Sequence, residues 1–361
     1  MSLKFQYTFP AIKGLQAGRE YFTIMCPLSI LQKLFIFDDN HYLPPNERSQ
    51  RVINRNRIPD ISEYIINNPT EYVFSSLTAS IDGEFEFTPF DLEQHKNIGT
   101  LSISMDSKLL INDGQHRKFA IQEALQAIPD LGKETISVVL FVDEKLKRSQ
   151  QIFSDLNKHA VNVSKSIGIL YDSRDPVAII TKDLVYSNKN LHRYTDLENS
   201  SLSKNSNKVF TLSNFYNANE KIIGDQEVNK KLIQFINEYW KFLTDNFYEW
   251  QLVFTKELSA HKLREQSVSS FGTILEAFGL IGYEVSKSPK MNWKEKLQNI
   301  NSINWSRDNF DDWKYRAISP QGNIIKNTRC IRLTAIFIKL QLGFALSDEE
   351  AEIENKFQKE K

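Results

Sequence analysis

The chain has 361 residues, and its 45 lysines and arginines balance 45 aspartates and glutamates, so its formal net charge is zero. A hydrophobic share of 41% and a charged share of 25% are those of an ordinary globular protein, long enough for about two domains. Two distant cysteines argue against a disulfide framework or a thiolate metal site. Nothing resembles a signal peptide or the roughly 20 apolar residues of a membrane span, so we expect a cytoplasmic protein.

The first half of the chain alternates between predicted strands and helices. β-branched and aromatic residues mark the strands, and apolar residues at helical spacing mark the helices. The predicted strands cover residues 20–26, 71–80, 84–88, 100–105, 108–112 and 135–143. The predicted helices cover residues 28–37, 47–57, a helix capped by Asp60, 115–127 and 145–160. The last strand is apolar on successive residues, which predicts a central place in a sheet.

Helical periodicity dominates the second half of the chain, with few strand signals. The strongest predicted helices cover residues 227–247, 267–285 and 332–346. We therefore predict an α/β domain over residues 1–195 and a mainly α-helical domain over residues 196–361.

The most informative motif is Asp113-Gly114-Gln115-His116-Arg117, between a predicted strand and a predicted helix. Glycine permits close backbone approach, and the unpaired N–H groups that begin a helix attract anions, above all phosphate. Arg117 can offer a planar fork to phosphate oxygens, and His116 can donate a hydrogen bond or move a proton. Asp113 can cap the helix or hold a Mg²⁺ ion. The alternative is an ordinary Asp-Gly turn with solvated neighbours.

Two other features are candidates for function. Arg48, Arg51, Arg55 and Arg57 lie within ten residues that contain no acidic side chain. They predict a stripe that contacts the DNA backbone, or else a solvated face whose arginines pair with acids elsewhere. Cys26 is a candidate redox residue, although its apolar surroundings equally predict a buried, inert thiol.

Residues 111–125, INDGQHRKFAIQEAL, resemble the signature of DGQHR-domain proteins, a group with a ParB/sulfiredoxin-like fold whose turn grips nucleotide phosphates. The segments AIKGLQAGREYF, RSQRVINRNRIPDISEYI and FSDLNKHAVNVSKS together resemble the DndB family of DNA sulfur-modification proteins, over most of residues 1–215. The resemblance implies a ParB/sulfiredoxin-like α/β domain before the helical one. Gln115 stands where sulfiredoxin has its catalytic cysteine, so we expect no sulfur chemistry at this turn.

The resemblance also implies a function. Members of the family are expected to bind double-stranded DNA at the promoter of their own phosphorothioation genes and to repress them. ATP, with or without Mg²⁺, would modulate this binding. By carry-over, the nucleotide site would comprise Asp113, Gly114, Gln115, His116, Arg117, Asn157 and Lys158.

Two alternatives stay open at this point. The first is an ATPase or nuclease in which Asp113 holds a metal ion and His116 acts on water as the catalytic pair. The second is a module that recruits other phosphorothioation proteins through its helical half.

Overall fold

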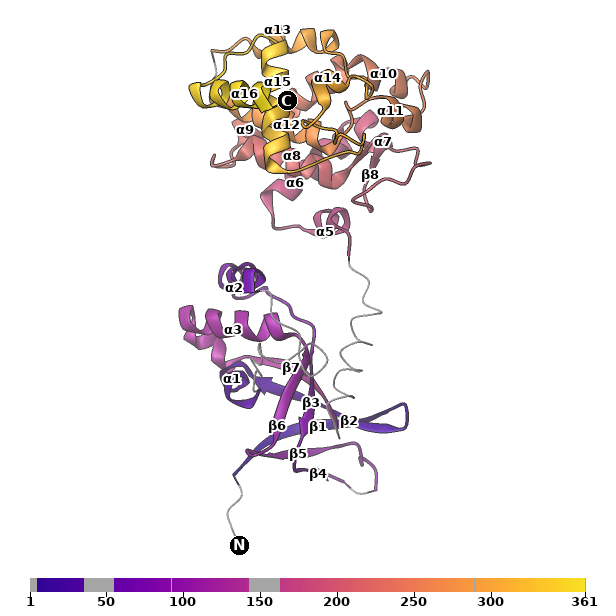
Figure 1. The fold of residues 1–361 in the computed structure, drawn as a ribbon. Coiled ribbons are helices and arrows are strands. Elements are labelled where there is room, and N and C mark those ends of the chain that lie inside the picture. Colours follow the sequence, from indigo (N-terminus) through magenta and orange to yellow (C-terminus); the bar gives the residue numbers. More distant parts are fainter. Residues whose placement is uncertain (1–4, 36–54, 92, 143–162, 289, 361) are drawn as a thin grey trace. The chain divides into compact units, whose positions relative to one another are not determined.

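The computed structural model describes residues 5–35, 55–91, 93–142, 163–288 and 290–360 (Figure 1). The chain divides into two compact units, Met1–Val161 and Asn162–Lys361. The expected boundary after residue 195 falls inside the second unit. The reason is that α6 (Pro176–Ser187) packs against both α7 (Lys189–Tyr194) and α8 (Leu212–Ile223) and shares their hydrophobic core.

The first unit is built on one seven-stranded mixed sheet with the strand order β4-β5-β1-β2-β7-β3-β6. Its strands are β1 (Gln6–Gln16), β2 (Arg19–Pro27), β3 (Leu77–Asp82), β4 (Phe85–Pro89), β5 (Ile98–Ser104), β6 (Lys108–Asp113) and β7 (Thr135–Val142). β3 and β7 run parallel, and the other neighbouring strands run antiparallel. The central placement of β7, between β2 and β3, is confirmed.

The strand predictions missed β1 and misplaced the start of β3. β1 pairs with both β2 and β5 but was not predicted, because its Pro10 and Gly14 are residues that seldom occur inside strands. The strand expected at 71–80 begins only at Leu77. The two residues before it, Ser75 and Ser76, direct their carbonyl groups to a side chain instead of to a neighbouring strand.

Short helical segments complete the first unit. They are η1 (Leu28–Ile30), α1 (Leu31–Leu34), η3 (Arg55–Arg57), α2 (Ile58–Asn67), α3 (Gln115–Ala127) and η4 (Pro129–Lys133). The bounds of α3 confirm the predicted helix at 115–127. α2 begins before Asp60, with Arg57 at its N-cap and Pro59 in its first turn, so Asp60 lies inside the helix and does not cap it. α1 and α2 both contact α3, and the three gather at one side of this unit (Figure 1).

The second unit is mainly helical, as predicted. Besides α6, α7 and α8 it contains α5 (Lys165–Tyr171), α9 (Lys230–Asn246), α10 (Tyr248–Phe254), α11 (Ala260–Gln266), α12 (Gly272–Lys287), α13 (Trp293–Leu297), η5 (Gln298–Ser302), α14 (Phe310–Trp313), α15 (Thr328–Gln341) and α16 (Asp348–Glu360). A short parallel pair, β8 (Thr195–Asp196) and β9 (Phe210–Thr211), precedes α8. None of the described helices combines the length and apolar character that spanning a membrane requires.

α12 organises the helical unit, because it packs against α8, α9 and α15. Its contact with α8 depends on Gly279, where an added Cβ atom would lie 2.5 Å from the carbonyl oxygen of Ala218. The helices can therefore approach this closely only because residue 279 has no side chain.

We expect Gly279→Ala to destabilise the helical unit by about 1–3 kcal/mol, because the methyl group must push α8 away. Gly168→Ala is the matched control: nothing lies within 4 Å of the added atom in α5, and alanine should stabilise that helix by up to about 1 kcal/mol. Urea unfolding followed by tryptophan fluorescence measures both, because all five tryptophans belong to this unit. Equal stability of the two variants would contradict the packing argument.

Candidate functional site

The β6–α3 turn has the backbone geometry of an anion-attracting helix start. Gly114 forms the N-cap of α3 with φ at 100°, a left-handed conformation that favours glycine. A Cβ atom here would also lie 2.3 Å from Cδ2 of Leu77. No side chain caps α3 and its first turn has no acidic residue, so the helix dipole is not neutralised locally.

Arg117 is already engaged by the protein. Its Nη1 donates hydrogen bonds to the carbonyl oxygen of Ser75 at 2.5 Å, to Oγ of Ser75 at 2.6 Å and to the carbonyl oxygen of Ser76 at 3.1 Å. Its Nη2 lies 2.6 Å from Oδ2 of Asp113. The Arg117 side chain is 16% exposed and that of Asp113 is 49% exposed. The guanidinium therefore joins α3 to the segment before β3, and it does so through partners that include the exposed residues Ser75 and Asp113.

Two neighbouring polar side chains of the turn, Gln115 and Lys118, also donate hydrogen bonds to backbone carbonyl groups of the protein. Gln115 is buried and its Nε2 donates to the carbonyl oxygen of Ile111 at 3.2 Å. Lys118 is buried, donates to the carbonyl oxygen of Phe35 at 2.7 Å, and has a pKa that burial lowers. His116 is half-buried on the first turn of α3. Sequence analysis missed Lys118, because nothing in the local pattern indicates contact with a residue as distant as Phe35.

The other predicted site residues are only partly described. Arg48, Arg51, Asn157 and Lys158 lie outside the described residues. Arg55 and Arg57 form η3 at the start of α2, and both are exposed. No group of three or more histidine, cysteine, aspartate or glutamate side chains suited to a metal ion occurs within the described ranges.

The candidate redox residue Cys26 is fully buried in the sheet core. Burial raises the pKa of its thiol to about 12. Redox reactions of cysteine proceed through the thiolate, which is scarce at such a pKa. This environment favours the inert alternative.

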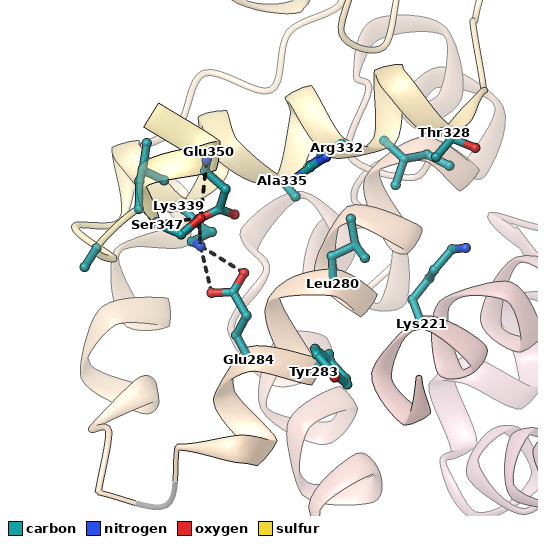
Figure 2. Close-up of a pocket in the computed structure, with 13 residues that line it drawn as sticks. Lys221, Leu280, Tyr283, Glu284, Thr328, Arg332, Ala335, Lys339, Ser347 and Glu350 are labelled. Atoms are coloured by element: carbon teal, nitrogen blue, oxygen red, sulfur yellow. Dashed lines mark hydrogen bonds and ion pairs between the residues drawn. The ribbon is translucent and has the colours of Figure 1, made fainter. Parts of the chain in front are cut away.

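The helical unit contains a cavity of about 720 Å³ between α8, α12, α15 and the start of α16, at which sequence analysis assigned no residue (Figure 2). The buried Lys339 ammonium lies between two carboxylates, 2.7 Å from Oε2 of Glu284 and 2.5 Å from Oε2 of Glu350. Burial raises the pKa of Glu284, whereas the hydrogen bond from Lys339 lowers that of Glu350 against the effect of burial. The network stabilises the junction of α12, α15 and α16.

The fold and the turn together define a class of protein in which a mixed α/β unit, with a strand–glycine–helix turn suited to anions, precedes a helical unit. The chain belongs to the DndB family of DNA-sulfur modification-associated proteins, whose model matches residues 9–345 and thus both units. No curated protein and no solved structure matches the chain. The ParB/sulfiredoxin-like character of the first unit therefore stays a prediction.

We expect Arg117→Ala to lower the local stability of the turn by about 3 kcal/mol, because the carbonyl groups of Ser75 and Ser76 lose a charged donor. Hydrogen exchange followed by mass spectrometry should show faster exchange in β3 and β6. Arg19→Ala, at an exposed position of the same sheet, is the control and should leave both strands protected. Unchanged exchange in Arg117→Ala would show that the clamp is dispensable.

We expect Lys339→Met to destabilise the helical unit by about 3 kcal/mol, because it leaves the Glu350 carboxylate buried without a cation. The double variant Lys339→Met/Glu350→Gln should recover part of that loss. Lys241→Met, which removes an exposed pair with Asp245, should change stability by less than about 1 kcal/mol. Urea unfolding with tryptophan fluorescence compares the three variants, and a Lys339→Met curve that matches the Lys241→Met curve contradicts the prediction.

Proposed function

We propose that this protein is a DNA-binding repressor of a DNA phosphorothioation gene cluster, and that ATP bound at the Asp113–Arg117 turn modulates its affinity for DNA. The supporting observation is the uncapped start of α3 at Gly114, inside a chain that matches the DndB family over residues 9–345. A helix start of this kind suits phosphate, and the family is associated with DNA sulfur modification.

Phosphate binding at the turn is an exchange of partners for Arg117. A phosphate at the start of α3 takes Nη2 from Asp113 and accepts hydrogen bonds from the backbone N–H groups, while Nη1 keeps its bonds to Ser75 and Ser76. The displaced carboxylate of Asp113 is then available to a Mg²⁺ ion that accompanies ATP. His116 lies on the first turn of α3, although its Nε2 is buried in the structure.

DNA contact is assigned to the arginines that precede α2. Arg55 and Arg57 are exposed, and α2 packs against α3, whose first residues form the proposed nucleotide site. A shift of α3 upon ATP binding would therefore move α2, the helix that directly follows Arg55 and Arg57. ATP can change DNA affinity only to the extent that it binds the two arrangements differently. Arg48 and Arg51 at the DNA surface, and Asn157 and Lys158 at the nucleotide site, stay predictions from the sequence, because they lie outside the described residues.

The first test measures fluorescence anisotropy of the native upstream DNA fragment and of a scrambled fragment, with and without Mg-ATP. We expect specific binding to the native fragment that ATP changes several-fold. Equal, weak binding to both fragments would contradict the repressor and favour a module that recruits other modification proteins. ATP or DNA turnover that disappears in Asp113→Ala would favour the ATPase or nuclease alternative.

A second test uses Arg55→Ala/Arg57→Ala. If the two arginines contact DNA phosphates, affinity should fall about equally for both fragments. The slope of log affinity against log salt should then become shallower by about 2, because two fewer counterions are released. Arg329→Ala, an exposed arginine of the helical unit paired with Glu360, is the control and should change neither quantity. An unchanged salt slope in the double variant would remove these residues from the DNA surface.

A further inference from the structure

The helical unit has a second cavity, of about 620 Å³, at the N-terminus of α12. Its walls come from residues 200–204, the start of α8, α11 and residues 270–272, together with Arg307 and Ile324. This volume suits a compact small molecule and is too confined for duplex DNA. The cavity lies wholly inside one unit, so its lining is fixed by the packing of that unit.

The first backbone N–H groups of α12 lie at a helix N-terminus without a side-chain cap. Phe271 is its N-cap without a side-chain cap, and the first turn carries no acidic residue. Within the described part of the chain, no protein acceptor takes the backbone N–H of Gly272 or of Thr273. α12 has 16 residues, so these N–H groups lie at the positive end of a full helix dipole.

Two side chains add donors at the same place. Ser270 lines the cavity, is 6% exposed, and its hydroxyl has no hydrogen-bond partner within the described residues. Asn214 uses its Oδ1 to accept from the hydroxyl of Thr211, which leaves its Nδ2 as a donor. That Nδ2 lies only 2.4 Å from the point that a Cβ of Gly272 would occupy. A buried hydroxyl left without a partner is costly, which indicates that a ligand or water satisfies it.

Two cationic side chains, Lys326 and Arg307, lie near the start of α12. Nζ of Lys326 lies 3.2 Å from the same Cβ position of Gly272 and 2.6 Å from Oε1 of Glu276. The Arg307 guanidinium lies over the Phe271 ring at 5.6 Å and donates to the carbonyl oxygen of Gly322 at 2.7 Å. Glu265, paired with His261, is the carboxylate on the cavity wall. The polar end of the cavity is thus suited to an anion.

The cavity also has apolar lining, from Leu202, Val209, Phe271 and Ile324, and Phe271 adjoins the polar start of α12. Arg264 fixes the loop that carries Leu202 by donating to the carbonyl oxygens of Ser203, Lys204, Ser206 and Lys208. An anion-binding end next to an apolar wall fits an organic molecule that carries a phosphate group.

We propose that this cavity binds the phosphate monoester of a compact organic molecule, with the phosphate at the start of α12 and the organic body against the apolar wall. Gly272 is required there, because a side chain would fill the space next to Asn214 and Lys326. This site is separate from the proposed ATP site in the first unit, and neither proposal depends on the other.

The test uses isothermal titration calorimetry of the full chain with phenyl phosphate, inorganic phosphate and phenol. Phenyl phosphate should bind at least about 10-fold more tightly than inorganic phosphate, and phenol should not bind measurably. Ser270→Ala and Asn214→Ala should each weaken phenyl phosphate about 10-fold, since each removes one donor from a charged group. Gly272→Ala should abolish binding.

Controls separate loss of binding from loss of the fold. Ser302→Ala, an exposed serine of the same unit, should bind like the natural protein, and tryptophan fluorescence should show that each variant is folded. Arg117→Ala should leave phenyl phosphate binding unchanged, which distinguishes this cavity from the turn in the first unit. The proposal would be overturned if phenyl phosphate did not bind, or if it bound no more tightly than inorganic phosphate. It would also be overturned if the Ser270→Ala and Asn214→Ala variants bound phenyl phosphate as tightly as the natural protein, or if only a DNA duplex bound.

Discussion

The guanidinium of Arg117 is the interaction on which the first unit most depends. It joins the start of α3 and the end of β6 to the segment before β3, which lies about 40 residues earlier in the chain. Replacing it by a lysine would not restore the arrangement, because only a planar fork reaches two carbonyl groups and a carboxylate together. The same engagement limits the chemistry of the turn, since a ligand must compete with Asp113 or with Ser75 for the guanidinium.

The two helix starts proposed to bind phosphate differ in electrostatics. Both have a glycine at the start, Gly114 as the N-cap of α3 and Gly272 as the first residue of α12, and neither has a side-chain cap or an acidic residue in its first turn. At α3 an ion pair must open before an anion enters, so the carboxylate of Asp113 sets a threshold for binding. At α12 the side-chain donors, from Ser270 and Asn214, are neutral, and the nearby Glu276 carboxylate is paired with Lys326. We therefore regard the first as suited to a conditional, switch-like ligand and the second to a constitutive one.

Sequence reasoning succeeded where local pattern decides structure and failed where distant contacts decide it. The bounds of α3 and the central strand β7 followed from periodicity and from a run of β-branched residues. The late start of β3 did not, because the carbonyl groups before Leu77 serve Arg117. The cluster at the start of α12 was equally out of reach, since Asn214 and Ser270 meet only in the folded helical unit.

The order of strands in the sheet has a consequence for how the chain is made. The first hairpin, β1–β2, lies between β5 and β7 in the complete sheet. Its two edges therefore stay unpaired until β5, which ends at residue 104, and β7, which ends at residue 142, have been synthesised. A nascent chain emerging from the ribosome therefore presents two unpaired strand edges until most of the first unit has been synthesised. The pairing of β2 with β7 joins residues more than a hundred positions apart, so the sheet should form slowly. Chaperone binding during translation would be of most benefit before this pairing forms.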